Sequence, residues 1–480
     1  MKLQDLPLDQ PDAQPADLGL VLERQRAVWA AEPCPPWPVR ADRLRRVQRL
    51  LQQHEADIAR AIDADFGGRP AIETELAEVW PSLEAVKDAL RHGPGWMKPR
   101  RAGVGKWFVP ARAQILPQPL GVVGIIVPWN YPLYLAVGPM VAALAAGNRV
   151  MVKMSELTPT FSALFQRLCN QAFKADEVCI VTGGAEVAAA FSTLPFNHLL
   201  FTGSTPVGRK VMAAAAANLT PVTLELGGKS PAVIAPGYPV KHAVQRILAG
   251  KLLNAGQTCI APDYVLLPRD QIEPFIDAAR AQARRSHATG LADADYCSIV
   301  NDRHYRRLAA DLDEAAGQGT RIEPLFDGAA RDDARHRLAP TLLVDPPPHS
   351  RVMRDEIFGP LLPLLPYDRV EDAIAFVNAR AHPLALYWFD HDAARTEHAL
   401  HTMPAGGVTV NDTLLHIAQD SLPFGGVGAS GMGHYHGRWG FDTFSKLKPV
   451  FRQSGVNGMA LFLPPYRPLM RRLLGLMKRF

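Results

Sequence analysis

Residues 121–154, GVVGIIVPWNYPLYLAVGPMVAALAAGNRVMVKM, contain the pattern that decides the fold. The stretch begins with a β-rich run at 121–127 and ends with another at 149–154, and an apolar helical segment at 133–146 lies between them. Two short strands joined by a helix form a parallel β–α–β unit, since parallel strands need a crossover of this kind. The pattern therefore predicts a parallel sheet that binds its ligand outside the carboxyl ends of its strands.

The same stretch has one feature of a membrane span, because no Asp, Glu, Lys or Arg occurs between Arg112 and Arg149. A transmembrane helix needs about 20 apolar residues without a break. Pro128, Pro132 and Pro139 interrupt this segment, and proline disrupts a helix interior. A buried strand, a turn and a buried helix are therefore the favoured interpretation.

Strands and helices continue to alternate on both sides of this unit, which predicts an α/β fold with more than one domain. Helical patterns come first, at 19–31, 39–64 and 72–91, and a basic segment rich in Pro and Gly at 98–120 predicts a projecting hairpin. Further strands are predicted at 178–183, 198–203, 221–226, 231–236, 263–268, 340–345, 360–365, 384–389 and 407–411. Further helices are predicted at 158–173, 186–192, 205–217, 239–252, 270–285, 302–316 and 369–378, and the glycine-rich segment 421–437 is expected to be loop.

The composition is that of an ordinary soluble enzyme, with 48% hydrophobic and 21% charged residues among 480. The formal net charge of +5 equals the number of basic residues in 466–480, a segment without acidic residues, so the rest of the chain is formally neutral. This balance disfavours nucleic-acid binding. The basic residues of that segment alternate with apolar residues at helical spacing, which predicts an amphipathic helix.

The five cysteines form no CxxC pair and are odd in number, which disfavours a disulfide framework and a structural zinc site. We therefore expect no metal and a reducing compartment. We expect a cytoplasmic location because the amino-terminal segment lacks the apolar stretch of a signal peptide.

Three short matches to nucleotide-binding or hydrolase motifs are incomplete. Gly228-Lys229-Ser230 resembles the end of a P-loop, but Thr223 stands where that motif needs glycine. The segment 426–431 matches GxGxxG without opening a helix, and Ser430 lacks the second glycine of GxSxG.

Three residues are candidates for chemistry. Cys259, in NAGQTCIAP, follows a predicted helix on a tight turn, where a thiolate can reach a substrate; a buried structural cysteine is the alternative. Glu225 ends a predicted strand ahead of two glycines, where a carboxylate faces the ligand cleft; a solvated surface glutamate is the alternative. Asn130, between two prolines in PWNYP, offers a fixed amide donor of the kind an oxyanion hole needs, or else it is a turn residue.

Six motifs in order resemble the aldehyde dehydrogenase superfamily over about residues 40–450. They are PWNYP at 128–132, FTGSTPVG at 201–208, LELGGKSP at 224–231, GQTC at 256–259, EIFGP at 356–360 and PFGGVGASG at 423–431. Finer features, such as CIAPDYV and SGMGHYHG, resemble the class 3 branch and its bacterial coniferyl-aldehyde dehydrogenases. The resemblance implies that Cys259 is the nucleophile, that Asn130 holds the oxyanion, and that Glu225 activates the water that hydrolyses the thioester.

The resemblance also implies the cofactor and the residues that bind it. NAD is expected and NADP is possible, because Met154 stands where the family usually has proline, which leaves the loop bearing Glu156 less rigid. Glu156 would repel a 2′-phosphate on the adenosine ribose. The implied cofactor-binding residues are Trp129, Lys153, Glu156, Gly203, Ser204, Gly208, Leu226, Glu356 and Phe358.

The implied architecture is a Rossmann-like cofactor domain, an α/β catalytic domain and a small β bridging element that forms a homodimer. The expected boundaries are 1–97 with 121–226 for the cofactor domain, 227–440 for the catalytic domain, 98–120 with 441–456 for the bridging element, and 457–480 for the tail. The tail is expected to dock over the substrate entrance or on the partner subunit, or alternatively to lie on an anionic membrane surface.

The expected reaction is NAD(P)-dependent oxidation of a hydrophobic aldehyde to its carboxylic acid. A coniferaldehyde-like aromatic substrate is favoured, and a long-chain aliphatic aldehyde is the alternative. Transfer of the acyl group to CoA is disfavoured by Glu225, and a catalytically silent binding protein is disfavoured by the complete set of three candidates. Tyr131, Tyr134 and His416 are candidates for the substrate tunnel, whereas His436 and the other four cysteines are expected to be structural.

Overall fold

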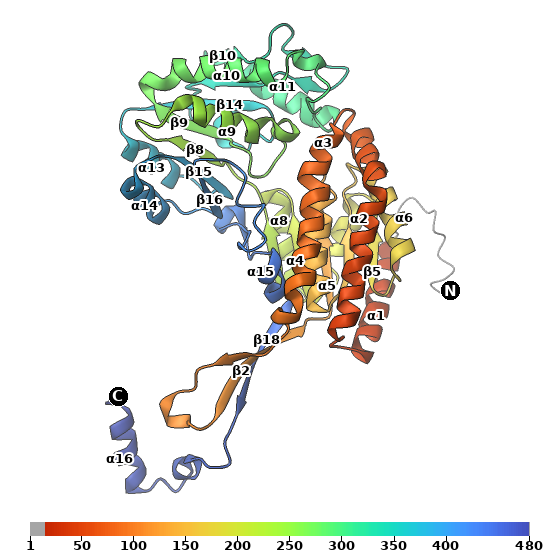
Figure 1. Ribbon diagram of the computed structural model, residues 1–480, viewed down its shortest axis with the longest axis vertical. Helices are drawn as coiled ribbons and strands as arrows, with labels where there is room; N and C mark the ends of the chain where they lie inside the picture. The colour runs from red at the N-terminus through yellow and green to blue at the C-terminus, as the bar shows by residue number, and fades with distance from the viewer. Residues whose placement is uncertain (1–14, 480) are drawn as a thin grey trace.

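The β–α–β unit predicted at residues 121–154 lies at the centre of a six-stranded sheet in the computed structural model, which describes residues 15–479 (Figure 1). Five strands are parallel, and the sixth, β17, pairs antiparallel with β7. In spatial order the strands are β17 (Gly431–Met432), β7 (Val222–Glu225), β6 (His198–Thr202), β3 (Val122–Ile126), β4 (Arg149–Lys153) and β5 (Val178–Val181).

Helices cover both faces of this sheet because successive strand residues point to opposite sides. Val122 and Ile126 of β3 pack in one cluster with residues of three helices, α1 (Pro15–Ala31), α7 (Ala185–Ser192) and α8 (Thr205–Ala216). Val123 and Ile125 pack in a second cluster with residues of four helices, α2 (Trp37–Phe66), α4 (Trp80–Trp96), α5 (Tyr134–Ala146) and α6 (Pro159–Ala172). All residues of α5 are buried, which explains its apolar sequence without a membrane.

A second, seven-stranded sheet forms the other lobe, drawn in green to blue in Figure 1. Its strands are parallel except β10. The spatial order is β10 (Arg321–Pro324), β13 (Thr341–Val344), β14 (Leu361–Tyr367), β9 (Tyr264–Pro268), β8 (Pro231–Ile234), β15 (Ala385–Phe389) and β16 (Gly407–Val410). The helices of this lobe are α9 (Val240–Leu252), α10 (Ile272–Ser286), α11 (Asp302–Gly317), α12 (Arg351–Arg354), α13 (Val370–Asn378) and α14 (Ala393–Thr402), and a two-stranded ribbon joins β11 (Arg331–Asp332) and β12 (Arg337–Leu338).

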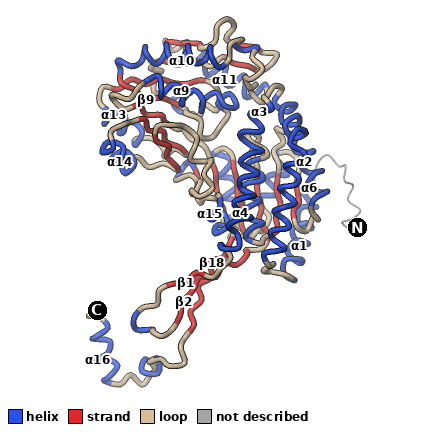
Figure 2. Tube along the Cα trace, viewed as in Figure 1, coloured by secondary structure: helices blue, strands red, loops and turns tan. Residues whose placement is uncertain are grey.

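The segment predicted as a projecting hairpin forms an arm that extends away from both lobes (Figures 1 and 2). Its three antiparallel strands are β1 (Arg100–Ala102), β2 (Arg112–Pro119) and β18 (Ser445–Arg452). The chain continues from β18 into the predicted amphipathic helix, α16 (Pro468–Met477), which lies at the far end of the arm.

The structure differs from the sequence predictions in several places. Helix α1 begins at Pro15, so the segment before residue 19 is not all irregular, while residues 1–14 lie outside the described part. The segment 421–437, expected to be loop, contains β17, which pairs with Leu224 and Glu225 of the first sheet. The chain therefore rejoins the first lobe at β17, and α15 (Gly437–Thr443) contacts α4 and α5 there, ahead of the expected boundary at residue 440. Within residues 15–479, no helix is long and apolar enough to cross a membrane.

Candidate active site

The three candidate residues converge on one cavity of about 230 Å³ between the two lobes. Asn130 lies on the loop after β3, Glu225 is the last residue of β7, and Cys259 lies on the turn before β9. The lining residues are Pro128, Trp129, Asn130, Thr202, Gly203, Ser204, Glu225, Leu226, Gly227, Cys259, His304, Arg307, Glu356 and Phe358. The cavity thus opens at the carboxyl ends of the parallel strands, where such sheets bind ligands.

An unusual backbone conformation positions the turn that carries Cys259. Asn254, Ala255 and Gly256 are consecutive residues with positive φ angles of 54°, 50° and 76°. A Cβ on Gly256 would lie 2.3 Å from the Gly359 carbonyl oxygen, so this position requires glycine. Non-glycine residues in the left-handed region are strained, and such strain persists where the surrounding structure holds it in place.

Asn130 is linked directly to the Cys259 turn. Its side chain is 3% exposed, and its Nδ2 donates a hydrogen bond of 3.2 Å to the Gln257 carbonyl oxygen. The next residue, Tyr131, shares a 2.6 Å hydrogen bond between its hydroxyl and Thr258 Oγ1. The amide carries two N–H groups, so one bond to Gln257 still leaves a donor for a ligand oxygen in the cavity.

Glu225 is 2% exposed, which shows that the interpretation as a solvated surface glutamate is wrong. Within residues 15–479, neither carboxyl oxygen of Glu225 has a hydrogen-bond partner. Burial raises the pKa of Glu225 well above its ordinary value, because a carboxylate loses its hydration in the cavity. A buried carboxyl group without a protein partner that lines a cavity is suited to bind water or substrate and to exchange a proton.

The Cys259 thiol is protonated in this environment. Burial, followed by the charges of Glu356 and Glu225, raises its pKa to about 12. Nucleophilic attack therefore requires removal of the thiol proton during the reaction, and carboxyl groups in the same cavity are available to accept it.

The start of α8 forms one wall of the cavity and contains the residues expected to bind a pyrophosphate. Ser204 is the residue before the helix, and its side chain makes no capping hydrogen bond. A Cβ on Gly208 would lie 2.7 Å from Leu226 Cδ2, so glycine allows the helix to pack closely on the strand end. The amino terminus of a helix favours bound phosphate because of its free N–H groups and its dipole.

Glu356 and Phe358 enter the cavity from the other lobe. A Cβ on Gly227 would lie 2.3 Å from both carboxyl oxygens of Glu356, so Gly227 provides the space for this side chain. Phe358 has a positive φ of 49° and packs edge-on against Trp129, with ring centroids 5.3 Å apart. Burial is the largest cause that raises the pKa of Glu356, to about 8.

Three of the expected cofactor residues lie outside this cavity: Lys153, Glu156 and Gly208. Lys153 is 1% exposed, and its Nζ donates to the carbonyl oxygens of Met154 at 2.7 Å and Gly183 at 2.6 Å, so it is not a solvated strand-end lysine. Glu156 is exposed on the loop that follows. Both lie at the carboxyl end of β4, the neighbour of β3 in the first sheet.

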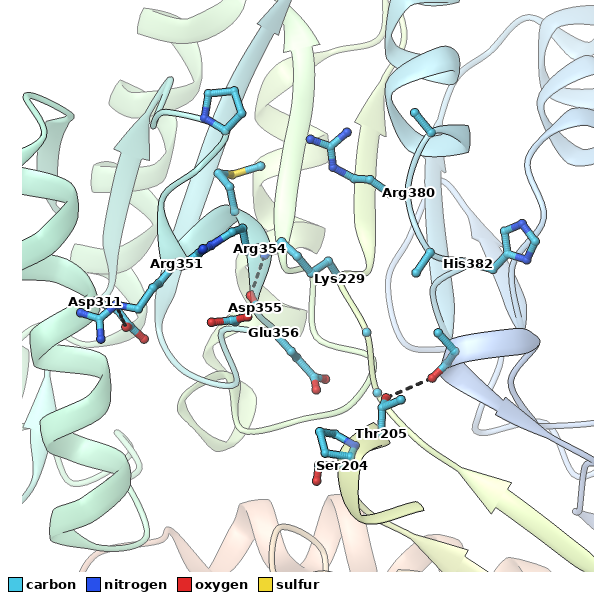
Figure 3. Close-up of a pocket in the computed structure, with 18 of the residues that line it drawn as sticks. Ser204, Thr205, Lys229, Asp311, Arg351, Arg354, Asp355, Glu356, Arg380 and His382 are labelled. Atoms are coloured by element: carbon cyan, nitrogen blue, oxygen red, sulfur yellow. Dashed lines mark hydrogen bonds and ion pairs between the residues drawn. The ribbon is translucent and has the colours of Figure 1, made fainter. Parts of the chain in front are cut away.

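A larger cavity of about 1070 Å³ adjoins the first, and the two share Ser204, Gly227, Arg307 and Glu356 (Figure 3). Several of its charged residues are held in place by polar contacts. Arg351 Nε lies 3.2 Å from Asp311 Oδ1, and Lys229 Nζ donates to the Asp355 carbonyl oxygen at 3.1 Å. Figure 3 marks both contacts with dashed lines. The two adjoining cavities pass the start of α8, and Ser204, Glu356 and Phe358 are lining residues that could hold an elongated cofactor.

Two cavity residues lie outside every motif that the sequence analysis singled out. They are His304 and Arg307, and the His304 ring lies 5.1 Å from the Trp129 ring. Burial is the largest cause that lowers the pKa of His304, to about 4, so the ring is neutral at pH 7. His304 and Arg307 belong to α11, and nothing in their sequence pattern distinguishes them from other polar residues of that helix.

None of the tunnel candidates, Tyr131, Tyr134 and His416, lines the cavity with Cys259. The Tyr134 hydroxyl lies 3.2 Å from His436 Nε2, and His416 Nδ1 lies 2.8 Å from Thr409 Oγ1. His436 is 5% exposed and shares this hydrogen bond with Tyr134, which fits the structural role expected for it.

Known proteins resemble this chain over most of its length. Residues 12–450 match the model of the aldehyde dehydrogenase family. The chain is 49% identical to a probable coniferyl aldehyde dehydrogenase of Pseudomonas aeruginosa, over 97% of each chain, and 39% identical to aldehyde dehydrogenase family 3 member H1 of Arabidopsis thaliana, over 91% of this chain and 89% of that one. The substrate-bound structure of Staphylococcus aureus AldH is 36% identical and superposes with a TM-score of 0.90, covering 95% of this chain and 99% of that one. The chain belongs to the aldehyde dehydrogenase family, in a branch similar to class 3.

Proposed function

We propose that this enzyme oxidises a bulky aromatic aldehyde of the coniferaldehyde type to its carboxylic acid, with NAD as the oxidant. The observation that carries the proposal is the convergence of Cys259, Asn130 and Glu225 on one buried cavity beside the start of α8. The similarity to a relative described as a probable coniferyl aldehyde dehydrogenase supports the choice of substrate.

The reaction begins when Cys259 Sγ adds to the aldehyde carbon and the thiol proton passes to the Glu356 carboxylate in the same cavity. The Asn130 amide and the Cys259 backbone N–H hold the oxyanion of the thiohemiacetal. Ser204, Glu356 and Phe358 would hold NAD, which would supply the hydride acceptor that the oxidation to a thioester requires. Glu225 then takes a proton from water, and the resulting hydroxide displaces the Cys259 thiolate to release the acid.

A panel of aldehydes tests the substrate class. We expect kcat/KM for coniferaldehyde to exceed that for decanal, measured as NADH absorbance with matched enzyme concentrations. A higher value for decanal would favour the long-chain aliphatic alternative. Acyl-CoA as the main product in the presence of CoA would contradict hydrolysis by Glu225, and bound NAD without NADH formation from any aldehyde would indicate a catalytically silent protein.

The preference for NAD over NADP rests on Glu156. A carboxylate beside the adenosine ribose would repel a 2′-phosphate, so we expect kcat/KM to be higher with NAD than with NADP. Glu156→Gln should weaken that repulsion and therefore bring the two kcat/KM values closer together. A kcat/KM that favours NADP tenfold in the wild-type enzyme would contradict this preference.

We also propose that the enzyme is a cytoplasmic homodimer joined through the arm. The arm exposes large apolar side chains, among them Trp107, Phe108 and Phe451, which a second subunit would cover. Leu469, Leu474 and Leu476 of α16 are exposed as well, and we favour their docking on the partner subunit over a membrane surface.

Sedimentation at micromolar concentration tests this assembly. The full chain is expected to form dimers, and a chain ending at Pro465 is expected to dimerise more weakly. A monomeric full chain would contradict the dimer, and binding to anionic vesicles by the full chain alone would favour the membrane alternative.

A further inference from the structure

A fully buried ion pair lies outside the set of reacting groups. Arg69 Nη1 is 2.8 Å from Glu78 Oε1, and both side chains are 0% exposed. The desolvation of two charges is costly, and a buried pair is often no more stable than apolar residues of similar volume. The pair therefore requires a role other than general stabilisation.

The pair holds the loop that bears Asn130 at two points, its middle and its junction with α5. Arg69 Nη1 donates a 3.1 Å hydrogen bond to the Asn130 carbonyl oxygen, and the guanidinium lies 5.0 Å from the centre of the Tyr131 ring. On the far side of the loop, Glu78 Oε2 accepts hydrogen bonds from the backbone N–H groups of Leu133 at 2.7 Å and Tyr134 at 3.2 Å. One ion pair thus spans the loop from the Asn130 carbonyl to the start of α5.

Irregular backbone brings both partners into place. Arg69 follows Gly67 and Gly68, whose φ angles are 67° and 135°, and its backbone N–H donates to Asp63 Oδ1 at 2.7 Å. Glu78 lies on a π-helical turn, η2 (Glu75–Val79), inserted between α3 (Ala71–Thr74) and α4. π-Helical turns are rare and occur frequently at functional sites.

The same carbonyl oxygen connects the pair to the Cys259 turn. Asn254 Nδ2 donates to the Asn130 carbonyl oxygen at 3.1 Å and to the Gln257 carbonyl oxygen at 3.2 Å, and the Asn130 side chain donates to that same Gln257 oxygen. The backbone of Asn130 is therefore fixed by Arg69 from one side and by the strained Asn254 segment from the other. A change at Arg69 would alter the distance between the Asn130 amide and the Cys259 turn.

We propose that Arg69 and Glu78 form a positioning pair that holds the Asn130 amide in the geometry needed to bind the oxyanion. The inference rests on the role of Asn130 in the proposed function. The pair touches no substrate and acts only through the loop at 128–132. Loss of the pair should slow formation of the thioester and leave NAD binding unchanged.

The double variant Arg69→Met/Glu78→Gln tests the proposal, because it removes both charges together and leaves no uncompensated buried ion. The readout is the burst rate of NADH formation in stopped flow with coniferaldehyde, together with the Kd for NAD. We expect the burst rate to fall by about 10²-fold, as for a small misplacement of a catalytic group, with an unchanged Kd. Arg69→Lys, which retains the charge but loses the planar guanidinium, should show a smaller decrease in the same direction.

The substitutions Arg69→Met/Glu78→Gln are also made in enzyme that carries Asn130→Ala. This comparison distinguishes a positioning role from a general destabilisation of the fold. If the pair acts through Asn130, its removal there should alter the burst rate by less than about twofold, since the group that it positions is absent. An equal decrease in both backgrounds, or no decrease in either, would overturn the proposal. Arg43→Met/Glu177→Gln removes a less buried ion pair of 3.2 Å in the first lobe, in which Glu177 also binds Arg46, and should leave the burst rate unchanged.

Failure of the proposed function gives a different result from failure of this inference. If Asn130→Ala alone leaves the burst rate at the wild-type value, the oxyanion role of Asn130 is wrong, and the positioning role is wrong with it. If Asn130→Ala slows the burst, but removal of the pair lowers the burst rate equally with and without Asn130, only the positioning role is wrong.

Discussion

Replacement of Cys259 by alanine is expected to lower kcat by about 10⁴-fold or more, because no other group can form the covalent intermediate. The measurement is NADH formation at saturating NAD and aldehyde. The variant should still bind NAD, because Ser204, Glu356 and Phe358 remain in place. Loss of turnover with retained cofactor binding would locate the defect in the chemical step.

Cys179→Ala is the matched control for this experiment. Cys179 is half-buried like Cys259, and burial likewise raises its pKa to about 12, but it lies on β5 and does not line the cavity. Its replacement should leave kcat within about twofold of wild type. Turnover by Cys259→Ala at more than a few per cent of the wild-type rate would contradict the assignment of the nucleophile.

Replacement of Glu225 by glutamine has the second-largest expected effect, a decrease in kcat of about 10²–10⁴-fold. Glutamine keeps the size of the side chain but cannot accept a proton from water. The first turnover does not need this step, so a burst of up to one NADH per active site should remain, followed by a slow steady state. Loss of the burst together with the steady state would contradict a role limited to hydrolysis.

The pH dependence provides an independent check on Glu225. Burial raises its pKa, so the carboxyl is increasingly ionised, and therefore active as a base, as the pH increases. We expect steady-state kcat of the wild type to keep increasing with pH above the range in which an ordinary glutamate is already fully ionised, whereas the residual rate of Glu225→Gln should lack this increase. Glu356 lines the same cavity, and Glu356→Gln should instead raise the KM for NAD.

The sequence predicted those parts of the site that depend on local pattern. Glu225 was expected at a strand end and Asn130 between two prolines, and both positions follow from short segments whose backbone is nearly determined by their residues. The meeting of Asn130, Glu225 and Cys259 in one cavity came only from the family resemblance, because the distances between segments far apart in the chain are absent from local pattern.

The features that the sequence analysis missed depend on tertiary contacts. His304 and Arg307 face the cavity because of how α11 packs, and a polar helical residue has the same sequence pattern whether it faces solvent or a ligand. Helix α14 was not predicted because Ala399 is its only buried residue in the structure, so it has no apolar stripe. Strand β17 has two residues in a glycine-rich segment and forms only because β7 provides a partner.

The central claim is that Cys259 carries the acyl group before Glu225 directs its hydrolysis. Mass spectrometry of Glu225→Gln, quenched in acid after reaction with coniferaldehyde and NAD, tests this claim most directly. The account predicts that the peptide containing Cys259 gains the mass of the feruloyl group and that the adduct is removed by hydroxylamine. An unmodified Cys259 peptide after an NADH burst, or an acyl group on another residue, would contradict it.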